Sequence, residues 1–132
     1  MGDTVYRPRG AQHFKLPASD LPIVINERVL SWMDYFTTRG RPIFQLWLDR
    51  MPVVAPMIDR ALADYDLPRD FVYLAMIESG FNPKAYSRAK ASGPWQFMKA
   101  TGRRYGLRVD EWVDERRDPE KATDAAARHL RD

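Results

Sequence analysis

Apolar residues recur at helical spacing along most of the chain. Val29, Trp32 and Phe36 fall on one helical face. This spacing predicts an amphipathic helix over about residues 22–38. No stretch shows the two-residue period of a strand over a useful length. The pattern therefore predicts an all-α protein.

Two prolines interrupt the next apolar stripe. Ile43, Trp47 and Met51 again share one helical face, and Pro52 and Pro56 follow them. Proline lacks the N–H that a helix needs, and its ring clashes with the preceding turn. We therefore expect two short helices in this part of the chain, divided at the prolines.

Capping residues mark the boundaries of the later helices. Asp66 is expected to cap a helix over about residues 68–79, which Gly80 would end. The Ser-Gly-Pro at 92–94 predicts the start of another helix. Asp-Pro at 118–119 predicts the start of the last one.

The chain divides into three expected parts. Residues 1–18 hold proline and glycine among polar neighbours, so we expect an irregular arm there. Residues 19–65 would form an N-terminal helical region, and residues 66–132 hold the residues with candidate chemistry. We expect the N-terminal helices to pack on this last part.

The composition is that of a folded protein with little net charge. At 132 residues, 45% of them hydrophobic and 30% charged, the chain can bury a core. Twenty-one Lys and Arg against 18 Asp and Glu leave a net charge of +3. No block of five like charges occurs, so we expect this excess to be spread along the chain, which gives nucleic-acid binding little support. The absence of cysteine excludes disulfides and thiolate chemistry.

One glutamate stands at the end of an apolar helix. Every residue from Phe71 to Ile77 is apolar or aromatic, so we expect this helix to be buried on most sides. Glu78 follows directly, where burial and the negative end of the helix dipole would both favour a protonated carboxyl group. Such a group can act as a general acid. The alternative is a solvent-facing glutamate in a frayed turn beside Gly80.

A hydroxyl downstream could orient this carboxyl group. Asn82 and Pro83 predict a turn that brings Ser87 back towards Glu78. The alternative for Ser87 is an ordinary cap or turn residue.

The stretch SGPWQFM mixes groups that suit a sugar. Gln96 offers a hydrogen-bonding amide between two aromatic residues, and Gly93 would let a ligand approach the backbone. Aromatic rings can cover the apolar faces of sugars, and amides can bind their hydroxyl or N-acetyl groups. Trp95 and Met98 could equally be core residues.

Other chemistries find little support. His13 and His129 lie far apart, with no cysteine and no metal-binding spacing around either, so we expect no metal. No glycine-rich phosphate loop and no G-x-S-x-G motif occurs. The arginines around Tyr105 could contact nucleic acid or form a solvated helix end. We interpret the mixed charges of residues 110–121 as a surface turn with local ion pairs.

Residues 66–132 resemble the first half of the catalytic domain of lytic transglycosylases of the soluble-lytic-transglycosylase (SLT), goose-lysozyme-like type. Glu78 with Ser79 matches the Glu-Ser signature of that family, and SGPWQFM matches its G-x-x-Q-x-M signature. The upstream helices look like the region that precedes the catalytic domain. The third signature, a Tyr-Asn pair, is not found, so we expect a lysozyme-like helical fold with an incomplete catalytic lobe.

The resemblance implies a role for each matched residue. Glu78 would be the catalytic acid, and Ser87 would supply the hydroxyl that orients it. The implied substrate-binding residues are Ser79, Gly93, Trp95, Gln96 and Met98.

The resemblance also implies a reaction that consumes no water. The glutamate would protonate the oxygen between N-acetylmuramic acid (MurNAc) and N-acetylglucosamine (GlcNAc), assisted by the acetamido group of the substrate. It would then take the proton of the 6-hydroxyl group, which closes a 1,6-anhydro ring. No metal or cofactor is implied.

Peptidoglycan strands would be the partner, and the periplasm or cell envelope the location. An export signal and any membrane attachment would lie outside this chain. Two alternatives stay open: a non-catalytic peptidoglycan-binding or scaffolding helical module, and a helical adaptor for nucleic acid or protein.

Overall fold

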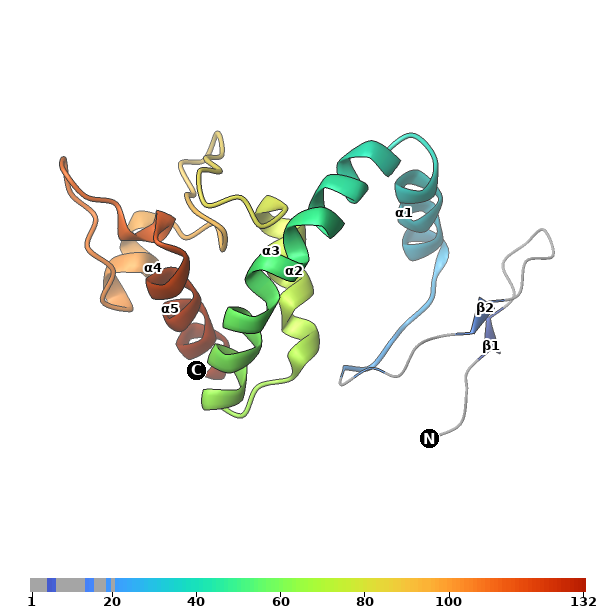
Figure 1. Cartoon of the computed structure of the whole chain (residues 1–132), viewed down its shortest axis with the longest axis horizontal. Coiled ribbons are helices and arrows are strands. Elements are labelled where there is room, and N and C mark those ends of the chain that lie inside the picture. The colour runs from blue at the N-terminus through green and yellow to red at the C-terminus, as the bar shows by residue number, and fades with distance from the viewer. Residues whose placement is uncertain (1–4, 7–13, 16–18, 20) are drawn as a thin grey trace. The chain divides into compact units, whose positions relative to one another are not determined.

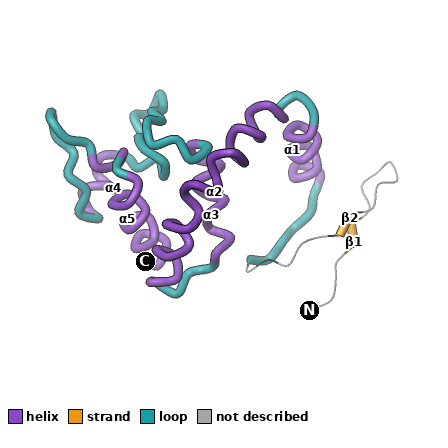
Figure 2. The backbone as a smooth tube through the Cα atoms, in the orientation of Figure 1, coloured by secondary structure: helices purple, strands orange, loops and turns teal. Residues whose placement is uncertain are grey.

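The chain forms two compact units. The structure, a computed structural model, describes residues 5–6, 14–15, 19 and 21–132. The first unit is Met1–Gln45 and the second is Leu46–Asp132. Figure 1 shows the order of the elements along the chain, and Figure 2 shows long loops between the helices of the second unit.

Two short strands lie in the arm that was expected to be irregular. Strand β1 (Val5–Tyr6) pairs antiparallel with β2 (Phe14–Lys15). The expectation of no regular structure is therefore wrong at these four residues, where β-branched and aromatic side chains favour extended backbone. The rest of the 1–18 arm lies outside the described residues.

Helix α1 (Glu27–Thr37) begins later than the predicted residue 22. Its first turn is capped by Asn26, whose Oδ1 accepts a hydrogen bond of 2.9 Å from the Val29 N–H. The predicted amphipathic face is a row of aromatic rings. Trp32 stacks on Phe36 with 5.8 Å between ring centroids.

Helix α2 (Arg41–Asp64) runs without a break through both of its prolines. The expectation of two short helices is therefore wrong. Pro52 and Pro56 are exposed, so the carbonyl groups that lose an N–H partner can bind water instead. In the second unit, Ile58 and Leu62 bury the opposite side of the helix, which stabilises it against the proline defects.

The third helical segment starts with a turn of 3₁₀ helix, Arg69–Phe71, and continues as α3 (Val72–Ser79). Asp66 does not cap it, because this residue takes a left-handed φ of 54° and ends α2, with its N–H bonded to the Ala63 carbonyl. Gly80 ends α3 with a φ of 60°, as predicted.

The helix predicted to start at residue 92 begins seven residues later, as α4 (Lys99–Arg104). Ser92 and Phe97 instead exchange two backbone hydrogen bonds, of 3.0 and 3.2 Å, and close a tight turn. Gln96 has a φ of 54° within this turn, which no right-handed helix permits. The sequence signal misled because Ser-Gly-Pro serves turns as well as helix starts.

Helix α5 (Pro119–Arg131) begins where the sequence predicts. The Asp118 Oδ1 accepts a hydrogen bond of 3.0 Å from the Lys121 N–H. The predicted alanine stripe is buried, at Ala122, Ala125 and Ala126. The all-α prediction is confirmed, apart from the two short strands of the arm. No helix in the described part of the chain is both long and apolar enough to cross a membrane.

A buried arginine sits where a surface turn was expected. Arg116, in the short 3₁₀ helix Glu115–Arg117, is only 1% exposed. Its Nε and Nη2 donate to the two oxygens of Asp114, each at 2.8 Å, and its Nη1 donates to the Lys90 and Phe97 carbonyls at 3.0 and 2.9 Å. This arginine therefore holds three segments of the second unit together. The expected local ion pairs also occur, for example between Arg108 and Asp110.

Acid should weaken the fold through Asp114. Hydrogen bonds from the Arg116 guanidinium hold the pKa of this carboxyl group below its ordinary value of 3.8, against the opposing effect of partial burial. Because the pKa is lower in the folded chain, the stabilisation is complete above the unfolded value and is lost as pH falls through the folded one. We expect the urea midpoint to stay level from about pH 7 to 5 and to drop below about pH 4.

Asp114→Asn should flatten this drop, measured by circular dichroism. Glu111→Gln, in the same loop and exposed, is the control and should leave the pH dependence unchanged. An unchanged slope in Asp114→Asn would show that other carboxyl groups cause the acid sensitivity.

Candidate active site

A cleft of about 330 Å³ opens between α3 and α5. Its floor is the turn at residues 95–98, and α4 adds one side chain. The lining residues are Leu74, Glu78, Trp95, Gln96, Phe97, Met98, Thr101, Ala126, His129 and Leu130. The cleft thus brings together Glu78, Trp95, Gln96 and Met98, four of the predicted site residues. Ser79, Ser87 and Gly93 do not line it.

Glu78 lies in the last turn of α3 and is exposed. The expectation that this helix is buried on most sides is wrong, because Tyr73 is 47% exposed and Ile77 72%. Only one face of α3 is covered, by way of Val72, Ala75 and Met76. The described residues therefore leave water around the carboxyl group.

Ser79 fastens the acid-bearing helix end to the neighbouring turn. Its Oγ donates a hydrogen bond of 2.7 Å to the Pro94 carbonyl and accepts one of 3.2 Å from the Asn82 N–H. These hydrogen bonds fix the end of α3 against the turn that bears Gln96. A substrate contact of Ser79 stays a prediction.

The amide of Gln96 is oriented by the backbone. Its Nε2 donates to the Gly93 carbonyl at 2.9 Å and to the Ala85 carbonyl at 3.2 Å. Carbonyl groups only accept, so the nitrogen must face them. The Oε1 atom is left as an acceptor on a side chain that lines the cleft.

Gly93 is required by internal packing. Its φ is 85°, and a Cβ atom at this position would lie 1.7 Å from the Arg116 carbonyl oxygen. The space on the Cβ side of Gly93 is therefore filled by backbone, and a substrate contact at this glycine stays a prediction. Glycine is the residue that fits both the close approach and the left-handed conformation.

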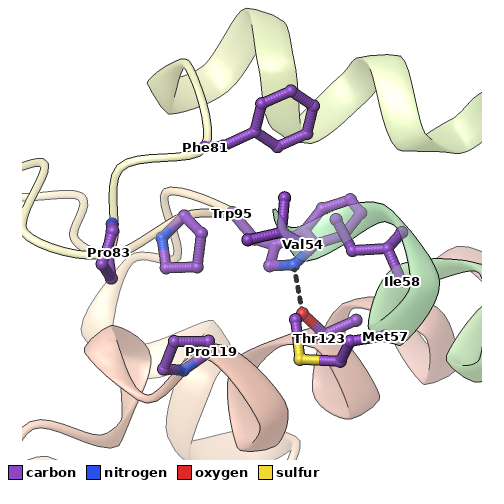
Figure 3. Close-up of a pocket in the computed structure, with 9 residues that line it drawn as sticks. Val54, Met57, Ile58, Phe81, Pro83, Trp95, Pro119 and Thr123 are labelled. Atoms are coloured by element: carbon purple, nitrogen blue, oxygen red, sulfur yellow. Dashed lines mark hydrogen bonds between the residues drawn. The ribbon is translucent and has the colours of Figure 1, made fainter. Parts of the chain in front are cut away.

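Trp95 forms a wall between two spaces. Its ring is 8% exposed, lines the cleft, and also lines an apolar cavity of about 50 Å³ on the α2 side. The indole Nε1 donates a hydrogen bond of 2.9 Å to the Thr123 Oγ1 (Figure 3). Trp95 is thus mainly a core residue, whereas Met98 is 46% exposed in the cleft wall.

Ser87 closes a local turn. Its Oγ accepts a hydrogen bond of 3.0 Å from the Ala91 N–H, and its own N–H bonds to the Ala91 carbonyl at 2.9 Å. Within residues 21–132 no hydrogen bond joins Ser87 to Glu78. Its orienting role stays a prediction.

The sequence of this chain is similar to that of a known domain family. The family model described as Transglycosylase SLT domain matches residues 56–132, more than half of the chain. The chain belongs to the SLT transglycosylase domain family. The two signatures around Glu78 and Gln96 therefore pointed to the correct family. The match begins inside α2, upstream of the boundary expected at Asp66.

Three relatives of the SLT domain share part of this chain. Membrane-bound lytic murein transglycosylase D of Escherichia coli strain K12 is 44% identical over 61 residues, which cover 46% of this chain and 14% of that protein. Peptidoglycan transglycosylase gp16 of Escherichia phage T7 is 45% identical over 67 residues, 50% of this chain and 5% of the relative. A putative tributyltin chloride resistance protein of Alteromonas sp. strain M-1 is 38% identical over 61 residues, which cover 46% of this chain and 30% of that protein. The chain thus spans a minor part of each relative.

One cleft residue of this SLT domain was considered in the sequence only as a metal ligand. His129 lines the cleft from α5, with its ring centroid 4.9 Å from that of Tyr105 and 6.2 Å from that of Phe97. Its position three residues after Ala126 places both on one helical face. That spacing is visible in the sequence, but only the fold shows that this face meets Glu78 across a cleft.

Proposed function

We propose that this chain carries the acid-bearing part of a peptidoglycan lytic transglycosylase. It would cleave the MurNAc-β-1,4-GlcNAc bond without water and leave a 1,6-anhydroMurNAc end. The observation that carries the proposal is that Glu78 and Gln96, from the two signatures, line one cleft in a chain of the SLT family.

The cleft offers a single carboxylic acid. Among its described lining residues, Glu78 alone bears a carboxyl group. Most glycosidases need two, one as acid and one as nucleophile or base. A lone carboxyl group suits a reaction in which the substrate supplies the second function through its own acetamido oxygen.

The proposed reaction proceeds in two steps. The Glu78 proton passes to the bridging oxygen as the bond from that oxygen to C1 of MurNAc breaks. The acetamido oxygen stabilises the electron-poor C1. The Glu78 carboxylate then takes the proton of the 6-hydroxyl group, whose oxygen forms the new bond to C1. The glutamate ends as it began, protonated, and no water is consumed.

A bound sugar would supply the desolvation that the described residues do not. Filling the cleft removes water from around the carboxyl group and brings that group against the substrate. The Gln96 Oε1 can meanwhile accept a hydrogen bond from a sugar hydroxyl or an acetamido N–H group. The amide thus fixes the substrate and the glutamate acts on it.

The names of the relatives indicate where this chain would act. Murein and peptidoglycan transglycosylases act on the cell wall, so we place this chain in the cell envelope, and in the periplasm in particular. Peptidoglycan strands are the proposed partner.

A second candidate function is non-catalytic peptidoglycan binding or scaffolding. The exposure of Glu78 and the turn-closing hydrogen bond of Ser87 favour it, because neither arrangement prepares a general acid. Gln96 and Met98 would still be available to contact a glycan.

Mass spectrometry of digested murein sacculi separates these functions. Incubation with the purified protein should release muropeptides with 1,6-anhydro ends. Reducing ends instead would indicate hydrolysis and contradict the proposed reaction. Retention of the protein on sacculi without any release would favour the non-catalytic module.

A further inference from the structure

The positive charge of the chain is concentrated in residues 79–109, the segment that also supplies five of the residues lining the cleft. Residues 79–109 contain seven Lys and Arg and no Asp or Glu, whereas the rest of the chain has 14 cationic and 18 acidic residues. The expectation of an evenly spread excess is therefore wrong. All seven cationic residues are exposed: Lys84, Arg88, Lys90, Lys99, Arg103, Arg104 and Arg108.

Most of these cations form no ion pair with a residue that the structure describes. Arg108 pairs with Asp110 at 2.7 Å, and Arg103 donates to the Val109 carbonyl. The other five make no ion pair with any residue in the described part of the chain. Like charges gathered in one segment repel and lower stability, so this excess is better explained by an external anion than by folding.

Two of the cations belong to loop segments that are linked by hydrogen bonds to residues lining the cleft, one directly and one through Arg116. Lys84 precedes Ala85, whose carbonyl accepts the hydrogen bond from the Gln96 Nε2. The carbonyls of Lys90 and Phe97 share the Nη1 of Arg116, and the Phe97 ring lines the cleft.

Two more belong to the segment that includes α4. Lys99 follows Met98, and Arg104 lies one helical turn beyond Thr101. Met98 and Thr101 both line the cleft. Lys84, Lys90, Lys99 and Arg104, here named the cationic rim, thus come from three segments that each adjoin the cleft.

We propose that the cationic rim binds carboxylate groups of the glycan strand, so that the site prefers a carboxylate-bearing glycan to a neutral one. This rests on the proposed function. In a peptidoglycan strand, carboxylates are carried by the peptide substituents and by muramic acid units that bear no peptide, whereas a polymer of GlcNAc alone carries none. Exposed cations beside a cleft gain from a repeating anion through many weak contacts, which salt screens.

The test compares two glycans and two variants of the full chain. Muroglycan oligomers that retain their peptides and neutral chitin oligomers of the same length are titrated at low salt. The rim variant carries Lys84→Gln, Lys90→Gln, Lys99→Gln and Arg104→Gln. The control variant removes the same charge at exposed positions outside residues 79–109, by Arg28→Gln, Arg39→Gln, Arg41→Gln and Arg60→Gln.

We expect the rim variant to bind muroglycan about tenfold more weakly, since each exposed contact contributes little and four are lost. Its binding to chitin oligomers should be unchanged, and the control variant should behave like the original protein. Added salt should remove most of the difference between the two glycans.

Four results would overturn the inference. The first is equal muroglycan affinity for the rim variant and the original protein, and the second is equal affinity of the original protein for both glycans. In either case glycan binding persists, so the proposed function survives. The third is tighter binding of duplex DNA than of muroglycan at the same salt, which would assign the rim to phosphates. Failure to bind either glycan would reject the proposed function together with the inference.

Discussion

Replacing Glu78 with glutamine is expected to lower the release of 1,6-anhydromuropeptides from sacculi by about 100-fold to 10,000-fold, the usual contribution of a general acid. Glutamine keeps the size and hydrogen-bonding capacity of the side chain but has no proton to give to the bridging oxygen. Mass spectrometry of the released fragments, normalised to enzyme and time, measures the effect.

The variant should fold normally, because the Glu78 side chain is exposed. Circular dichroism should therefore be unchanged, and binding to sacculi should persist. Glu111→Gln removes an exposed carboxylate that does not line the cleft and is the matched control. Full activity in Glu78→Gln would remove the proposed acid from the mechanism.

Replacing Arg116 with methionine is expected to destabilise the second unit by about 3–5 kcal/mol, the usual result of removing one partner from a buried ion pair. The change would leave the Asp114 carboxylate without its two guanidinium bonds, and the Lys90 and Phe97 carbonyls without a donor. Urea unfolding followed by circular dichroism measures the loss.

Arg117→Met tests whether burial is the cause. This neighbouring arginine has a side chain that is 47% exposed and donates one hydrogen bond of 3.0 Å to the buried Ser92 hydroxyl. We expect its loss to cost about 1–2 kcal/mol. Arg116→Lys should lie between the two, because lysine keeps the charge but cannot form the planar fork. Equal shifts for Arg116→Met and Arg117→Met would show that the buried network contributes little to stability.

Helix boundaries were predicted correctly where a single residue determines the local backbone conformation. Gly80 ends α3 because a left-handed residue at that point favours glycine, and Asp118 caps α5 because its carboxylate reaches free N–H groups. Such effects act over a few residues and need no knowledge of the fold. The two signatures predicted the family for the same reason, since each fixes several neighbouring residue types.

Errors arose where distant contacts outweigh local preference. Pro52 and Pro56 break helices in general, but in α2 they face solvent while Ile58 and Leu62 are buried. Ser92 resembles a helix cap, but its backbone pairs with Phe97. Neither outcome can be derived from spacing along the chain.

The sequence picked out four residues that lie at one cleft, but it did not predict how exposed they are. Glu78, Gln96, Trp95 and Met98 do meet at one cleft, whereas the burial expected for Glu78 is absent. An apolar run shows that a helix can be buried. How much of its surface is buried depends on the elements that pack against it. Arg116 was missed because a buried arginine and an exposed one look alike in sequence.

The hydrogen bond from the Ser79 hydroxyl to the Pro94 carbonyl closes the base of the intervening loop. Because the acid and the amide are joined across this base, residues near its tip can be added or lost without moving one relative to the other. Lengthening a loop whose ends are held costs little free energy. Substitutions, insertions and deletions around Arg88 and Ala89 can therefore change the surface of this loop while Glu78 and Gln96 keep their relative position.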